Sequence, residues 1–167
     1  MIVVCGLNDA QAQINLHRVQ SVIGILSPET QHPAYAGIRP ERHLKLSFSD
    51  VNEAAEGMTL ASHSDAEKLV AFVKEWDREA PLLIHCWAGI SRSSAVAFAA
   101  LCTLKPQEDE FVLAKNLRAA SLLATPNRLI TQKVDDVLNR RGRMVQAVES
   151  IGRGLNAYQG IPYILKV

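Results

Sequence analysis

One stretch of the chain, LLIHCWAGISRSSAVAFAALC at residues 82–102, constrains the fold more than any other. Residues 82–86 follow Pro81 and are rich in Leu and Ile, which is typical of a buried strand. Residues 92–104 are apolar on all sides and rich in Ala and Ser, which predicts a buried helix. A polar loop separates the two apolar runs, and burial of its flanks does not explain it.

Apolar runs and capping signals predict the other elements. Strands are expected at 2–5, 22–26 and 43–48. Helices are expected from Asn8-Asp9 onward and at 65–79, 106–123, 127–140 and 142–152. The segment Ser64-Asp65-Ala66-Glu67 has the pattern of a capping box, and Pro106 has the place of a first-turn proline. Residues 49–62 are expected to form a loop, and the last dozen residues carry no assignable pattern.

Strands alternate with helices early in the chain, and helices dominate later. This order predicts an α/β fold in one domain over residues 1–167. The expected architecture is a small central mixed or parallel sheet of about four strands, flanked by helices on both faces, with a helical C-terminal part. In such sheets, ligands bind beyond the carboxyl ends of the strands. Cys86 lies at such an end.

Composition argues against several classes of function. The 167 residues are 48% hydrophobic and 21% charged, as in globular proteins. The net charge of +1 gives no general attraction to nucleic acid or to an anionic membrane. The arginines within residues 140–153 lack interleaved aromatic residues and fit a solvated helix face better than a nucleic-acid site. Any selectivity for an anion must therefore come from a local site.

The N-terminus and the cysteines indicate a compartment. The start, MIVVCGLNDAQ, has too short an apolar run for a signal peptide and lacks a basic leader, and no apolar stretch is long enough for a membrane span. Cys5, Cys86 and Cys102 are an odd number without CxxC or His-rich spacing, which argues against a disulfide framework and a zinc site. Reduced thiols in a cytoplasmic setting fit these features best.

The polar loop has the components of an anion site. A loop of this length can turn its backbone N–H groups inward, and the dipole of the following helix adds partial positive charge. Gly89 permits a backbone angle or a close approach that a side chain would block. The planar fork of Arg92 can hold two phosphate oxygens, and the positive surroundings favour the thiolate of Cys86. A nucleophile at the floor of an anion cradle is suited to phosphoryl transfer.

The loop sequence HCWAGISRS resembles the signature loop of the cysteine-based protein tyrosine phosphatase superfamily, and it is most similar to the dual-specificity branch with its HCxxGxSRS pattern. The segment ATPNRLITQ, residues 124–132, is similar to the Pro-Asn segment that follows the loop in that branch. With the preceding strand and Asp50, the resemblance covers about residues 43–138. It implies hydrolysis of phosphotyrosine, alone or with phosphoserine and phosphothreonine, without a metal or organic cofactor.

Carried onto this sequence, the resemblance assigns roles to the loop residues. Cys86 is the expected nucleophile and forms a phosphocysteine intermediate, and Arg92 binds the phosphoryl oxygens and stabilises the transition state. Ser93 is expected to donate a hydrogen bond to the sulfur, and His85 to orient the loop and support the thiolate. The remaining loop residues are expected to surround the substrate phosphate: Trp87, Ala88, Gly89, Ile90 and Ser91.

The general acid must be a carboxylic acid on a loop that reaches the leaving oxygen. Asp50 follows the strand predicted at 43–48 and precedes Cys86 by 36 residues, which fits the acid position of the family. Glu53 on the same loop is the alternative. Asp65 fits a first-turn helix position better than a catalytic one.

Structural roles remain open for several of these residues. Cys86 could be an ordinary buried thiol and His85 a core histidine. Trp87 could form a pocket wall or pack against a neighbouring helix. Asn127 is expected to cap the helix at 127–140 whether or not it also supports the loop.

Two other functions also remain open. Relatives that act on inositol lipids often carry lysines inside the loop, whereas Trp87, Ala88, Ile90 and Ser91 are uncharged. A pseudophosphatase-like phosphate-binding module usually lacks the cysteine or the arginine, and both are present here. The expected ligands are a phosphorylated protein or a small phosphate monoester, with phosphate, sulfate or vanadate as anions in the site.

Overall fold

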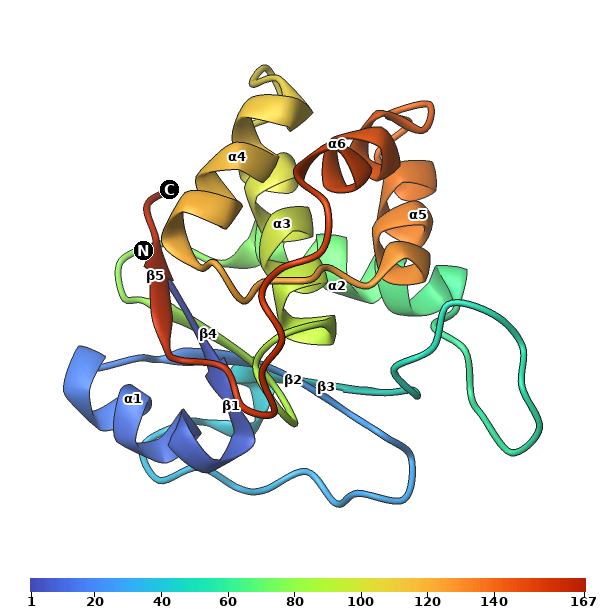
Figure 1. Ribbon diagram of the computed structural model, residues 1–167. Helices are drawn as coiled ribbons and strands as arrows, with labels where there is room; N and C mark the ends of the chain where they lie inside the picture. Colours follow the sequence, from blue (N-terminus) through green and yellow to red (C-terminus); the bar gives the residue numbers. More distant parts are fainter.

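A computed structural model describes all 167 residues and confirms the predicted α/β architecture. Five strands form one sheet in the order β3-β2-β4-β1-β5 (Figure 1). Their bounds are β1 Ile2–Gly6, β2 Ser21–Leu26, β3 His43–Ser47, β4 Leu82–Cys86 and β5 Tyr163–Leu165. The first four strands run parallel to their neighbours, and β5 is antiparallel to β1. β4 is therefore the central strand, and the polar loop follows its carboxyl end.

Helices cover both faces of the sheet, as predicted. The α-helices are α1 Ala10–His17, α2 His63–Glu75, α3 Arg92–Leu104, α4 Glu110–Ala120, α5 Arg128–Val137 and α6 Arg143–Ile151, and the two short 3₁₀ helices are η1 Leu7–Asp9 and η2 Pro40–Arg42. α1 and the chain between β2 and β3 lie on one face, whereas α2 to α6 lie on the other (Figure 1). With cover on both sides, β1, β2 and β4 are buried along their whole length.

α3 is the helix that the apolar run predicted. Eleven of its thirteen residues are buried, because it packs on the sheet and is covered in turn by α2, α4 and α5. Small side chains such as Ala97 and Ala100 let these neighbours approach closely. A helix buried on all sides holds its N-terminus in a fixed position, and that terminus adjoins the polar loop.

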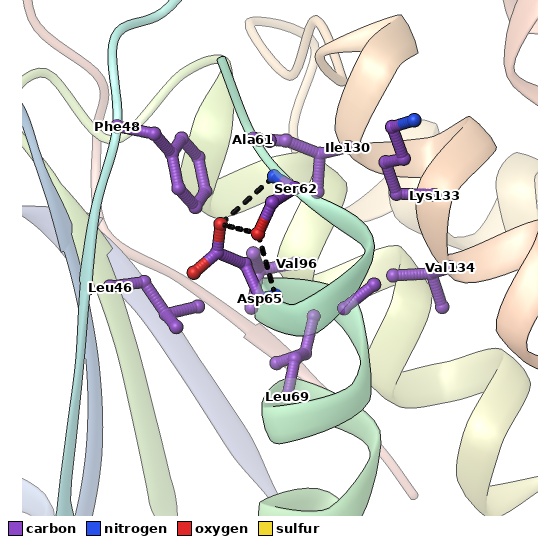
Figure 2. Close-up of a pocket in the computed structure, with 11 residues that line it drawn as sticks. Leu46, Phe48, Ala61, Ser62, Asp65, Leu69, Val96, Ile130, Lys133 and Val134 are labelled. Carbon is purple, nitrogen blue, oxygen red and sulfur yellow. Dashed lines mark hydrogen bonds between the residues drawn. The ribbon is translucent and has the colours of Figure 1, made fainter. Parts of the chain in front are cut away.

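α2 begins two residues earlier than its predicted capping box. The N-cap is Ser62, not Ser64: Ser62 Oγ accepts a hydrogen bond from Asp65 N at 3.1 Å, and Asp65 Oδ2 accepts one from Ser62 N at 2.9 Å (Figure 2). This start also places Ala61, just before the cap, and Ala66, in the first turn, on one apolar crevice. Ala61 and Ala66 hold the two positions of a hydrophobic staple, N′ and N4, which favours Ser62 over the alternative cap. The crevice encloses about 10 Å³ and is a packing seam without room for a ligand.

One other helix start was predicted wrongly, and one short strand was not predicted. The helix predicted from Pro106 to about residue 123 is α4, which begins at Glu110. Asp109 caps it by accepting hydrogen bonds from Phe111 N at 2.8 Å and Val112 N at 3.4 Å, and Pro106 lies in the preceding turn. The sheet has five strands rather than about four, because β5 forms from the unassigned C-terminal residues and pairs with β1.

Candidate active site

The carboxyl ends of four parallel strands meet at one edge of the sheet. β4 ends at Cys86 and β1 ends at Gly6 beside it, since these two residues are register partners. β2 ends just before Ser27, and β3 ends just before Phe48. Residues that are far apart in the sequence therefore surround the segment of residues 86–92, here called the Cys86–Arg92 loop.

The backbone of this loop turns its carbonyl groups outward. They accept hydrogen bonds from surrounding segments: Trp87 O from Leu7 N at 3.0 Å, Ala88 O from Gly160 N at 2.7 Å, Ile90 O from Thr125 N at 3.0 Å and Ser91 O from Asn127 N at 3.4 Å. The N–H groups of Trp87, Ala88, Ile90 and Ser91 donate to no protein atom. Because the two polar groups of a peptide unit point in opposite directions, outward carbonyls leave inward N–H groups. This arrangement is an anion-binding nest.

Gly89 meets both conditions that the sequence suggested for it. Its φ is +76°, a left-handed conformation that favours glycine. A Cβ atom there would lie 2.6 Å from the carbonyl carbon of Cys5 and 2.6 Å from the nitrogen of Gly6. The loop can therefore pack directly against the end of β1 only because residue 89 has no side chain.

Cys86 lies at the floor of the loop and is 2% exposed. Gly89 N donates a hydrogen bond to its Sγ at 3.2 Å. The thiol donates to Ser93 Oγ at 3.3 Å, and this direction must reverse in the thiolate, which can only accept. Ser93 lies in the first turn of α3, so the sulfur faces the positive end of a buried helix dipole.

Arg92 is 5% exposed, and its guanidinium group is only partly satisfied. Nη1 donates to Phe48 O at 2.9 Å and to Ser27 Oγ at 3.2 Å. The buried Nε has no hydrogen-bond partner and lies 3.9 Å from Asp50 Oδ2. A buried N–H without an acceptor is costly, and an anion in the loop would supply one.

Asp50 reaches the loop through two hydrogen bonds. Its Oδ1 accepts from Ser91 Oγ at 2.7 Å and from Asn127 Nδ2 at 2.9 Å. Asn127 also caps α5, as predicted, because its Oδ1 accepts from Ile130 N at 3.0 Å. Glu53, the alternative acid, is exposed and forms no hydrogen bond or ion pair with the site.

The side chain of His85 points to the face of the sheet opposite Cys86, because neighbouring residues of a strand alternate in direction. Its Nε2 lies 2.9 Å from the hydroxyl of Tyr35. Burial, more than any other cause, lowers the pKa of His85 to about 4, so the imidazole is neutral at physiological pH. A neutral His85 can act on Cys86 only by fixing the backbone between them.

Two cavities flank the loop. Trp87 is 59% exposed and, with Arg92 and Ser27, lines a cavity of about 250 Å³, so its ring forms a wall rather than packing on a helix. The other cavity encloses about 600 Å³ on the side of Asp50 and Ser91.

No pattern in the sequence predicted that the C-terminal segment contributes to the site. Gly160 donates to Ala88 O, and a Cβ there would lie 2.8 Å from Gly89 O, so the chain before β5 passes directly over the loop. Tyr163 OH lies 3.1 Å from Ser94 Oγ and joins β5 to the first turn of α3. These contacts join residues more than 60 positions apart, which no local pattern reveals.

The structure contains no group of three or more His, Cys, Asp or Glu side chains arranged to hold a metal ion. None of its helices combines the length and apolarity that a bilayer crossing requires. Cys5, Cys86 and Cys102 are all unpaired and buried.

Comparisons with known proteins identify the fold. No protein-family model and no curated protein sequence matches the chain. In contrast, 90 chains of solved structures match, among them several dual-specificity phosphatases. DUSP15 is 18% identical, with 89% of this chain and 90% of that chain covered and a TM-score of 0.63. Human DUSP28 is 18% identical, with coverage of 84% and 92% and a TM-score of 0.62.

A third structure is that of PTPMT1 in complex with PI(5)P, which is 15% identical, with coverage of 90% and 94% and a TM-score of 0.61. In all three comparisons, the aligned region extends over most of both chains. The chain therefore has the fold of the dual-specificity phosphatases.

Proposed function

We propose that this protein is a cysteine-dependent phosphatase that hydrolyses phosphate monoesters of protein side chains, phosphotyrosine and also phosphoserine or phosphothreonine. The observation that carries the proposal is the buried, unpartnered Nε of Arg92 beside a nest of free N–H groups, with Cys86 Sγ at its floor. Donors converge on a position where a phosphoryl group would contact a nucleophile. The three unpaired thiols fit a reducing compartment such as the cytoplasm.

In the first step, the thiolate of Cys86 attacks phosphorus. An S–P bond forms while the P–O bond to the leaving group breaks, and Asp50 in its acid form gives a proton to the departing oxygen. The inward N–H groups and the Nε of Arg92 stabilise the charge on the transferring phosphoryl oxygens.

In the second step, water attacks the phosphorus of phosphocysteine. The S–P bond breaks, Asp50 takes a proton from the water, and inorganic phosphate leaves. Ser93 donates a hydrogen bond to the departing sulfur, at the 3.3 Å contact already present. Both ionisation states of Asp50 are thus used once per cycle.

The hydrogen bonds of Asp50 support its choice over Glu53 as the acid. Ser91 and Asn127 hold the Asp50 carboxylate against the loop, whereas Glu53 extends from the same segment into solvent. A module that binds phosphate without turnover needs the nest and Arg92 but has no use for a carboxylate held in this place. The placement of Asp50 therefore favours an enzyme.

Hydrolysis of phenyl phosphate, whose leaving group needs an acid, in the presence of EDTA and across roughly pH 5 to 8, tests the proposal. The wild type is expected to turn over, and Cys86→Ser to be inactive. Asp50→Asn is expected to lower kcat roughly a hundredfold and to remove the basic limb of the pH profile. Glu53→Gln is the matched control and should retain both the rate and the profile. Wild type that binds vanadate but shows no turnover would overturn the enzymatic proposal.

A further inference from the structure

The cavity of about 600 Å³ beside the Cys86–Arg92 loop is large enough for a ligand rather than for water alone. Asp50 and Ser91 line it on the side of the loop. Arg153, Asn156 and Tyr158 line it from the C-terminal segment that follows α6. It is therefore continuous with the proposed catalytic site but is built largely from residues that the proposed chemistry does not use.

The position of Asp50 shows which part of a substrate would enter this cavity. A general acid must contact the leaving oxygen, so the leaving group lies on the Asp50 side of the phosphate. This step rests on the function proposed above. The side chain that carries the phosphate, and the residues next to it, would then occupy the cavity.

Arg153 is the only cationic side chain that lines the cavity, and it forms no hydrogen bond or ion pair within the protein. Asn156, also on the wall, is likewise free of side-chain hydrogen bonds. Asn52 Oδ1 accepts from Arg128 N at 3.0 Å and from Leu129 N at 3.2 Å, which leaves its amide NH₂ group as a free donor. Once Asp50 is protonated, as the mechanism requires, the cavity carries a net positive charge.

The backbone around Arg153 is held in place. Gly152 O accepts from Arg118 Nη2 at 2.8 Å, and Gly154 N donates to Thr125 Oγ1 at 3.1 Å. Arg118 also donates to Ala124 O at 2.7 Å, so a single guanidinium joins both sides of this junction. Thr125 N in turn donates to the loop at Ile90 O. The backbone at Arg153 is thus anchored relative to the loop, so only the side chain of Arg153 must be ordered when a ligand binds.

The character of the remaining wall indicates a peptide. The C-terminal segment lines the cavity with both apolar and polar side chains: Leu155 and Ala157 flank Asn156, and Tyr158 follows. Together with Ile90, they can contact an aromatic ring, whereas they form no continuous apolar channel for acyl chains. We propose that the cavity binds a phosphopeptide that carries a second anionic side chain next to the phosphorylated residue, and that Arg153 pairs with this second anion.

The test compares paired phosphotyrosine peptides, one with aspartates flanking the phosphotyrosine and one with asparagines. Wild type is expected to prefer the acidic peptide in kcat/KM, and Arg153→Gln to lower kcat/KM for that peptide roughly fivefold while leaving the neutral peptide within about twofold. The preference should shrink as ionic strength rises. Arg141→Gln is the control, because Arg141 is also exposed and unpaired but follows the C-terminal end of α5, whereas the N-terminal end of α5 adjoins the loop.

The same experiment separates failure of this inference from failure of the proposed function. Turnover of an aryl phosphate with no peptide preference, or an equal preference in Arg153→Gln, would overturn the peptide site and leave the phosphatase standing. If nothing is turned over, binding of the two peptides to Cys86→Ser tests the site without catalysis. A stronger Arg153-dependent preference for a soluble inositol bisphosphate than for the acidic peptide would overturn the assignment to peptides.

Discussion

Asn127 serves the fold and the candidate site with one side chain. Its carbonyl oxygen caps α5 at Ile130 N, and its amide nitrogen donates to Asp50. Its backbone nitrogen also donates to Ser91 O. The sequence predicted the cap, because Pro126-Asn127 precedes an amphipathic run, but the bond to Asp50 depends on where the start of α5 lies relative to the segment after β3. The local sequence therefore predicts that Asn127 caps a helix, whereas its hydrogen bond to Asp50 depends on the tertiary structure.

At Gly89, a single added methyl group should damage both stability and activity. In Gly89→Ala the new Cβ must displace the backbone at Cys5 and Gly6, at 2.6 Å, while alanine takes an unfavourable φ of +76°. We expect the free energy of unfolding to fall by about 2 kcal/mol or more, with a loss of turnover, because the N–H groups of the loop shift. Urea unfolding and aryl phosphate hydrolysis measure the two effects.

Gly37→Ala is the control that separates the cost of a left-handed backbone from the cost of a steric clash. Gly37 has a similar φ of +84°, but nothing lies within 4 Å of its virtual Cβ. It should show only the cost of the left-handed conformation, about 1 kcal/mol, and should keep full activity. Equal destabilisation by the two substitutions would contradict the packing of the loop against β1.

At the scale of elements, the sequence predicted the helices and strands that local residue patterns determine. β4 and α3 were predicted correctly because both are buried on every side, and burial explains their mostly apolar and small residues. The start of α4 was misjudged because a first-turn proline is a weaker signal than the oxygen of Asp109, which satisfies two N–H groups. β5 could not be predicted, because three residues make a strand only when β1 presents a free edge to them.

In the candidate site, too, the sequence predicted the residues that share a local segment but not the contacts made by distant segments. Cys86, Arg92 and Ser93 share one short segment, so their order along the chain nearly determines their geometry. Asp50 was predicted from its place after a strand and from the acid position of the resembled family, and parallel strands do bring it to the same edge of the sheet as Cys86. The contacts of Ser27 and Gly160 with the loop could not be predicted, because both residues lie in chain segments without a recognisable sequence motif.

At the scale of the whole molecule, the face opposite the catalytic side contains a group of buried histidines. His43 and His85 both lie near Tyr35, with ring centroids 5.3 Å and 5.6 Å from the tyrosine ring. Burial lowers the pKa of each from its usual value near 6.5 to about 4. His85 Nδ1 and His43 Nε2 have no hydrogen-bond partner, and for both rings the cost of burying a charge is the largest influence on the pKa.

The stability of the molecule should therefore fall under mildly acid conditions. Below about pH 6.5 the unfolded chain binds protons at these histidines, whereas the folded chain does not until about pH 4. These two histidines leave the free energy of unfolding unchanged above pH 6.5, and they lower it as the pH falls from 6.5 to about 4. By pH 5 the loss should reach about 2 kcal/mol for each histidine, measured by urea unfolding across the pH range.

Substitution of one histidine should flatten this dependence. His43→Gln is expected to lose less stability than wild type between neutral pH and pH 5, by about 2 kcal/mol, whatever its stability at neutral pH. A wild type equally stable at pH 7 and pH 5 would contradict the neutral state of the buried group.

The central claim is that Cys86 carries the phosphoryl group during turnover. The most direct measurement is mass spectrometry of the Cys86 peptide after rapid denaturation of Asp50→Asn that is turning over nitrophenyl phosphate. Nitrophenolate departs without an acid, so the first step does not depend on Asp50. In Asp50→Asn the second step lacks the base that takes a proton from water, so phosphocysteine should accumulate. We predict a gain of one phosphoryl group on Cys86. Turnover with Cys86 unmodified throughout, or phosphate on another residue, would contradict the account.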